Sequence, residues 1–110
     1  MSQKPLEIKF YYFEDCPSHE TALSRLNQIL DEEQAERHLD IIRVETHEDA
    51  ERLNFPGSPT ILINGTDIDP NVSELQAALT CRTYRLDDGR ITPLPSEVMI
   101  RNAVQKALSK

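Results

Sequence analysis

Apolar and polar positions alternate at the start of the chain, over residues 6–13 (LEIKFYYF). One face of an extended segment would carry the residues of even number: Leu6, Ile8, Phe10 and Tyr12. The other face begins with the charged residues Glu7 and Lys9 and becomes apolar at Tyr11 and Phe13. This period of two predicts a β-strand. Because both faces are apolar at its far end, we expect that end to lie inside the sheet, as in a central strand.

The period then changes to that of a helix, which is predicted over residues 17–37. The apolar residues at helical spacing are Ala22, Leu23, Leu26, Ile29 and Leu30. Their pattern is typical of an amphipathic helix that buries one face. Pro17 suits the first helical turn, where its missing N–H costs nothing. Either Asp15 or Cys16 is therefore expected to be the N-cap.

Shorter elements follow. Residues 39–46 predict a second strand, and residues 48–53 a short helical turn. An apolar run at 60–63 predicts a third strand. The Asn64-Gly65 dipeptide is a strong hairpin signal, so a return strand is expected at 66–68.

The last third of the chain is less regular. A short helix is expected at residues 73–79 and an edge strand at 82–86. Ser96 is a good N-cap for a final helix at 97–108, whose apolar residues recur at helical spacing.

This order predicts one α/β domain over residues 1–110, with an insert at about 69–95. The expected order is β-α-β-(α)-β-β-α, with a central mixed sheet flanked by helices. A full helix joins the first two strands, so they should be parallel with a right-handed crossover. The Asn64-Gly65 turn makes the third and fourth strands antiparallel.

The net charge of the chain narrows the classes of partner that it can bind, and its apolar stretches indicate its location. The 110 residues carry a formal net charge of −7, which argues against binding to nucleic acid or to an anionic membrane surface. No apolar stretch approaches the roughly 20 residues of a spanning helix, and the first residues lack the apolar region of a signal peptide. We therefore expect a cytoplasmic protein. In that reducing compartment Cys16 and Cys81 should not form a permanent staple, which leaves free thiols, a transient disulfide or a soft-metal site.

Cys16 is the first candidate for chemistry. It lies where the first strand gives way to the first helix, near unpaired N–H groups and the positive end of the helix dipole, which favour the reactive thiolate. Glu14 and Asp15 oppose this, because neighbouring carboxylates disfavour another negative charge. His19 follows three residues later on the same helical face. It could stabilise the Cys16 thiolate or move its proton, or it could be an exposed residue without a role.

Cys81, 65 residues after Cys16, is the second candidate. It could act as a resolving thiol, with Arg82 favouring its thiolate, or it could be a small buried apolar residue. The spacing does not decide whether the two cysteines meet. Cys16, His19 and Cys81 could also supply ligands for Zn²⁺, Cu(I) or Hg²⁺. Outside this set, His38 and His47 are expected at the surface, and Asp67 and Asp69 in a turn.

A proline-containing corner precedes the third strand. Ser58, Pro59 and Thr60 open that strand, where a proline can supply a cis bond and a rigid corner. An ordinary trans turn is the alternative.

Together, Cys16-Pro17 at a strand-to-helix corner and Ser58-Pro59-Thr60 before the third strand resemble the thioredoxin-fold superfamily. The patterns E-x-C-P, F-x-G-S-P-T-I-x-x-N-G-x-D-I and C-R-x-Y are similar to those of short bacterial thioredoxin-like proteins, some of which carry an alkylmercury-lyase-like name. The resemblance implies that Ser58-Pro59 is cis and lies near Cys16, with Pro17, Ser58, Pro59 and Thr60 facing a substrate. The chain departs from the dithiol pattern at His19, which replaces the second cysteine of a CxxC motif.

The expected function is thiol–disulfide oxidoreduction by an atypical thioredoxin-like protein with a CxxH motif. Cys16 would be the nucleophile and His19 its neighbour, either in a monothiol cycle or with Cys81 as the resolving thiol. The partner would be a protein or small-molecule thiol or disulfide, and no cofactor is expected. Two alternatives stay open: a non-catalytic thioredoxin-like binding or scaffold module, and a soft-metal binding protein.

Overall fold

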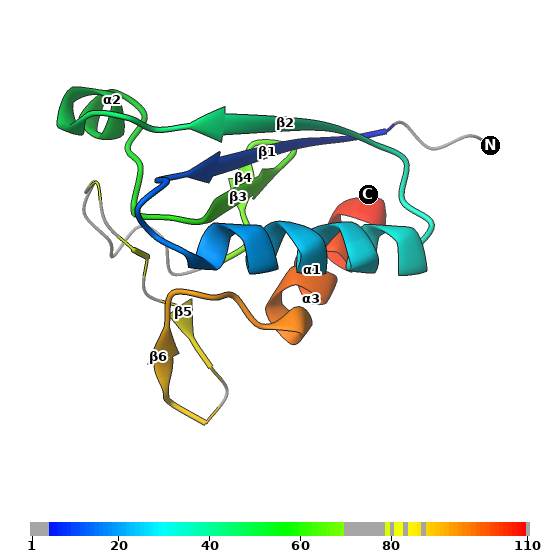
Figure 1. Cartoon of the computed structure of the whole chain (residues 1–110). Coiled ribbons are helices and arrows are strands. Elements are labelled where there is room, and N and C mark those ends of the chain that lie inside the picture. The colour runs from blue at the N-terminus through cyan, green and yellow to red at the C-terminus, as the bar shows by residue number, and fades with distance from the viewer. Residues whose placement is uncertain (1–4, 70–78, 80, 83, 87, 110) are drawn as a thin grey trace.

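A four-stranded mixed sheet and two longer helices form the body of the protein (Figure 1). The structure, a computed structural model, describes residues 5–69, 79, 81, 82, 84–86 and 88–109. Its elements in chain order are β1 (Leu6–Tyr12), α1 (Ser18–Glu32), β2 (Arg37–Arg43), α2 (His47–Arg52), β3 (Thr60–Ile63), β4 (Thr66–Asp67), β5 (Tyr84–Arg85), β6 (Ile91–Thr92) and α3 (Glu97–Leu108).

The sheet has the strand order β2-β1-β3-β4, so β1 is a central strand. β1 runs parallel to β2 and antiparallel to β3, and β3 pairs antiparallel with β4 across the Asn64-Gly65 turn. The predicted mixed sheet, with a parallel first pair and an antiparallel hairpin, is confirmed.

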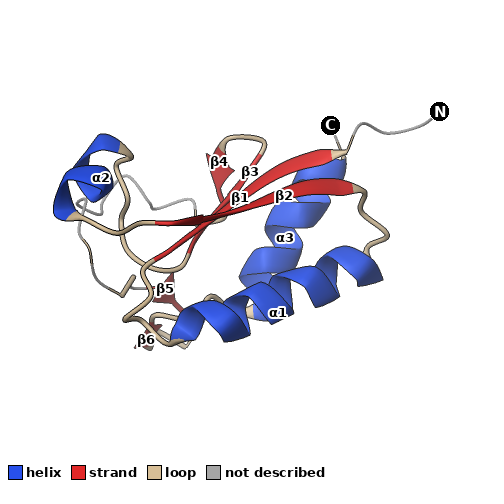
Figure 2. Ribbon diagram, turned by 45° about the horizontal axis from the view of Figure 1, so that its top comes forward, coloured by secondary structure: helices blue, strands red, loops and turns tan. Residues whose placement is uncertain are grey.

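The main core lies between one face of the sheet and the two longer helices. Figures 1 and 2 show α1 and α3 together on that face. Alternate residues of β1 point into this layer, and Ile8 and Phe10 are at most 1% exposed. The helices contribute Leu26 and Leu30 from α1 and Val104 from α3, all fully buried. The period-two and helical patterns of the sequence therefore converge on one apolar layer.

Among the described residues, a second cluster covers one end of the opposite face of the sheet. Glu7 and Lys9 are exposed on this face. Farther along β1, Tyr11 packs against a smaller cluster formed by Val44, Ala50 of α2 and Phe55. The far end of the first strand therefore packs on both sides, as predicted, but it is not fully buried: Tyr11, Tyr12 and Phe13 are all half-buried.

The first helix differs from its predicted limits at both ends. Pro17 is its N-cap, with helical φ −72° and ψ −11°, so the prediction of Asp15 or Cys16 as N-cap is wrong. At the other end Gln34 adopts φ 55°, a left-handed conformation that stops the helix. The chain then enters β2 at Arg37, two residues before the predicted start of that strand.

In the last third of the chain, the prediction for the final helix is confirmed and the prediction for the segment 82–86 is not. The final helix has its predicted bounds, and the Ser96 side chain accepts a hydrogen bond from the Met99 N–H. Within the segment 82–86, the described residues Tyr84 and Arg85 form β5, which pairs with β6 in a separate hairpin and not with the main sheet. The predicted helix at 73–79 lies outside the described residues, apart from Leu79.

The described part of the chain is compact, with a Cα radius of gyration of 13.4 Å. None of its helices is both long and apolar enough to cross a membrane.

Candidate functional site

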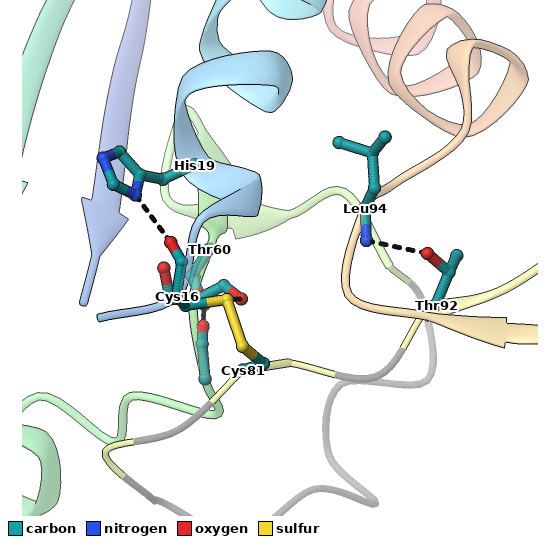
Figure 3. The surroundings of a disulfide bond; sticks show 8 residues. Cys16, His19, Thr60, Cys81, Thr92 and Leu94 are labelled. Carbon is teal, nitrogen blue, oxygen red and sulfur yellow. Dashed lines mark hydrogen bonds between the residues drawn. A yellow bond between two sulfur atoms is a disulfide. The ribbon is translucent and has the colours of Figure 1, made fainter. Parts of the chain in front are cut away.

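Two cysteines far apart in the sequence meet at the beginning of α1. Cys16 and Cys81 form a disulfide across 65 residues, with their Cα atoms 5.5 Å apart (Figure 3). Cys16 directly precedes the N-cap Pro17. Cys81 is held from the other side, in a parallel β-bridge with Ser58. The structure thus joins the two cysteines whose contact the sequence left open.

The two cysteines differ in their exposure. Cys16 is only 1% exposed, and its Sγ lies 3.5 Å from the carbonyl oxygen of Ser58. The Cys16 N–H also donates to the Phe13 carbonyl at 3.0 Å, which fixes the corner between β1 and α1. Cys81, in contrast, is an exposed residue. One sulfur of the pair therefore belongs to a buried residue and the other to a residue open to solvent.

His19 contacts the main chain of Cys16 rather than its sulfur. Its Nδ1 lies 2.7 Å from the Cys16 carbonyl oxygen, and Figure 3 draws this contact as a dashed line. Because a carbonyl oxygen only accepts, Nδ1 carries the hydrogen. The ring also stacks on Tyr12, with centroids 4.6 Å apart. His19 thereby fastens the first turn of α1 to the end of β1; its stabilisation of a thiolate stays a prediction.

The Ser58-Pro59 bond is cis and lies beside Cys16, as the resemblance implied. The Pro59 carbonyl accepts a hydrogen bond from the Tyr84 hydroxyl at 2.6 Å. The Thr60 hydroxyl donates to the Gly57 carbonyl at 2.6 Å. One hydrogen bond within the corner and one from Tyr84 therefore fix the conformation of the segment next to the disulfide.

Gly57 allows the segment with Cys81 to lie directly on this corner. Its φ is +126°, and a Cβ at this position would lie 2.7 Å from the Cα of Arg82. In the same contact the Arg82 N–H donates to the Ser58 carbonyl at 2.8 Å. A side chain larger than hydrogen would push the two backbones apart.

A buried ion pair anchors the residue after Cys81. The Arg82 side chain is fully buried, and its two terminal nitrogens each donate to a carboxylate oxygen of Asp67 at 2.7 Å. Asp69 lies 3.7 Å from the same guanidinium, whose carbon is 4.4 Å from the centre of the Tyr84 ring. This network corrects the prediction that Asp67 and Asp69 are simple turn residues.

The network also fixes two protonation states. Burial by itself lowers the pKa of Arg82, but the hydrogen bonds that Arg82 donates to Asp67, together with the electrostatic effects of Tyr84, Asp67 and Asp69, outweigh it and the pKa is raised. Burial raises the pKa of Tyr84 far above its usual value, and the charge of Arg82 offsets this only in part. Tyr84 is therefore a neutral donor to Pro59, and the charge of Arg82 is matched by Asp67 rather than free to act on Cys81.

The sequence contained a signal for this network. Arg82 and Tyr84 have the same parity in a short extended segment, and so do Asp67 and Asp69 around Ile68. Side chains of equal parity share a face, but only the fold brings the two faces together. His38 and His47 are exposed, as predicted.

Neither family models nor curated proteins match this chain. A function must therefore be argued from the site itself. Among the described residues, no group of three or more His, Cys, Asp or Glu side chains is arranged to hold a metal ion. The chemistry that the site does offer is that of a disulfide between a buried and an exposed cysteine.

Proposed function

We propose that this protein is a thioredoxin-like thiol–disulfide oxidoreductase whose redox pair is Cys16 and Cys81. The observation that carries the proposal is the disulfide between them at the start of α1, beside Ser58-Pro59. In a CxxC motif the second thiol would stand at position 19, which His19 occupies here. The disulfide shows that another cysteine of the chain can pair with Cys16 instead. Cys81 would supply this second thiol from the segment that lies over the corner.

The architecture supports the thioredoxin-like part of the proposal. A β-α-β unit is followed by a β-β hairpin and a final helix, with the strand order β2-β1-β3-β4. The cysteine precedes the first helix, and the cis-proline precedes β3. These are the relative positions that the resemblance implies for the two parts of a thioredoxin-like site.

The reaction needs no cofactor. Two substrate thiols would lose two electrons and two protons and become a disulfide, while the Cys16–Cys81 bond becomes two thiols; the reverse reduces a substrate disulfide. The Cα atoms are 5.5 Å apart, within the range in which a disulfide forms without backbone movement. In the cytoplasmic setting that the sequence predicts, a disulfide that forms and breaks is more typical than a permanent one.

The test is a reductase assay with dithiothreitol as electron donor and insulin as a general disulfide substrate. The wild-type protein should accelerate insulin reduction, and both Cys16→Ser and Cys81→Ser should abolish the acceleration. His38→Ala, at an exposed site away from the disulfide, is the matched control and should keep full activity. If Cys81→Ser stays active while Cys16→Ser does not, the cycle is monothiol and the proposed pair is wrong.

The two other functions have less support. In a scaffold module the disulfide would be structural, and the wild-type protein would show no turnover in this assay. In a soft-metal protein Cys16, His19 and Cys81 would converge on one ion. However, the two sulfurs are joined to each other and Nδ1 of His19 is engaged by a carbonyl oxygen.

A further inference from the structure

The two sulfurs of the disulfide have unequal surroundings, and we propose that this assigns their roles. Cys81 is the sulfur that exchanges with the substrate, and Cys16 is the leaving and resolving thiol. This inference rests on the redox function proposed above. It reverses the order expected from the sequence, in which Cys16 was the nucleophile.

Access is the first reason. A thiolate that opens a disulfide must reach one of its two sulfurs. Cys16 is 1% exposed, enclosed by the β1–α1 corner and the Ser58 carbonyl. Cys81 is an exposed residue, and its main chain is bridged to Ser58. An incoming thiolate therefore meets Cys81 first.

The leaving group is the second reason. Exchange is faster when the expelled sulfur is the more stable thiolate. Cys16 lies just before the 15-residue helix α1, whose N-cap Pro17 provides no side-chain cap for the free N–H groups. These groups and the helix dipole stabilise a negative charge. The neighbouring carboxylates of Glu14 and Asp15 oppose it, but Glu14 is paired with Arg43 at 2.6 Å. The positive charge of Arg82 does not stabilise a Cys81 thiolate, because the Asp67 carboxylate neutralises it.

The resulting steps balance. A substrate thiolate attacks Sγ of Cys81, forms a mixed disulfide with it, and expels Cys16 as a thiolate. A second substrate thiolate then attacks the substrate sulfur of the mixed disulfide, so that Cys81 leaves as a thiolate and the substrate leaves as a disulfide. In the reverse direction the Cys81 thiolate attacks the substrate disulfide and expels one substrate thiolate. The Cys16 thiolate then attacks Sγ of Cys81, restores the internal bond and releases the other.

The experiment locates the mixed disulfide on the oxidised full chain. The protein is mixed with glutathione, quenched with acid after short times, alkylated with N-ethylmaleimide and digested with trypsin. The two cysteines fall on separate peptides, residues 10–25 and residues 53–82, because Lys and Arg residues flank each of these segments. Glutathione is expected on the peptide with Cys81, and the maleimide on the peptide with Cys16.

Single-cysteine variants provide the rates. With an aromatic disulfide as probe, the Cys81 thiol of Cys16→Ser should react at least about tenfold faster than the Cys16 thiol of Cys81→Ser, since buried cysteines are poorly reactive. In guanidinium chloride the two rates should become similar, which ties the difference to the folded site.

Failure of the order and failure of the function give different results. Glutathione mainly on Cys16, or equally on both cysteines, overturns the order but leaves a redox-active pair. A disulfide that exchanges with neither glutathione nor dithiothreitol overturns the proposed function, and the order with it.

Discussion

At the scale of single residues, Arg82 is the side chain on which the site depends most. It follows Cys81 directly, and its guanidinium is fully buried against Asp67. Its main-chain N–H meanwhile bonds the Ser58 carbonyl, which also contacts Cys16. One residue thus links the exposed cysteine both to the sheet, through Asp67 in β4, and to the proline corner.

The first prediction concerns this ion pair. Asp67→Asn should lower the free energy of unfolding by about 3 kcal/mol, because the buried Arg82 charge loses the carboxylate that accepts its two 2.7 Å hydrogen bonds and keeps the more distant Asp69, at 3.7 Å. Asp88→Asn is the matched control: Asp88 binds Arg90 at the same 2.7 Å, but both side chains are more than half exposed. Its loss should stay below about 1 kcal/mol. Denaturant unfolding measures both, and equal losses would contradict the anchoring role of Asp67.

The second prediction concerns Tyr84. Burial raises the pKa of its phenol, so the folded protein keeps the proton well above pH 10, whereas the unfolded chain releases it near the ordinary value of 10.0. Above that pH the unfolded state binds fewer protons, and stability therefore falls as pH rises, by up to about 1.4 kcal/mol per pH unit. Tyr84→Phe should remove this contribution. Unfolding free energies of both proteins between about pH 9 and 11 test it, and parallel curves would speak against it.

At the scale of elements, the helices and strands predicted best from the sequence are those whose bounds are set by residues close together in the chain. The bounds of β3 and α3 coincide with their predictions, because an apolar run and a capped amphipathic pattern are both local signals. The left-handed turn at Gln34 was missed, since no Gly, Asn or Pro marks the end of the helix there. The β5–β6 hairpin was also missed, because two-residue strands are too short to show a period.

The features of the site likewise divide into local ones, which the sequence predicts, and long-range contacts, which it does not. The placement of Cys16 before a helix and of Pro59 before a strand follows from local pattern. The pairing of Cys16 with Cys81 does not, because a separation of 65 residues fits many folds. The Arg82–Asp67 contact likewise depends on two elements meeting. The resemblance to a known superfamily, not the spacing, was what pointed to a cis bond near Cys16.

The third prediction concerns the contact between the corner and the Cys81 segment. Gly57→Ala places a Cβ against the backbone of Arg82 and should push Cys81 away from Cys16. In glutathione buffers, the equilibrium constant for closing the disulfide should fall about tenfold or more, since overpacking costs about 1–3 kcal/mol. Gly89→Ala is the matched control, with φ +90° but open space around the position. An equal effect of both variants would mean that backbone strain, not the close contact, is responsible.

At the scale of the whole molecule, the core is closed without the disulfide. Its buried residues come mainly from β1, α1, β3 and α3. Arg101 of α3 adds an ion pair to Glu33, just after α1, at 2.8 Å. The bond between Cys16 and Cys81 instead fastens a later segment to the corner of this core. Reduction should therefore leave the protein folded, as a redox cycle requires.

The last prediction concerns the stability of the two redox states. By the chain-entropy account, a disulfide that spans 65 residues stabilises the folded state by roughly 4 kcal/mol. Addition of a phosphine reductant should lower the unfolding free energy by up to this amount, while the far-ultraviolet circular dichroism at low temperature stays that of a folded α/β protein. The double variant Cys16→Ser/Cys81→Ser should not respond to the reductant. If the reduced wild-type protein unfolds outright, the disulfide is a structural staple and a catalytic cycle through it is ruled out. If it stays folded but less stable, the same bond can open and close at the site.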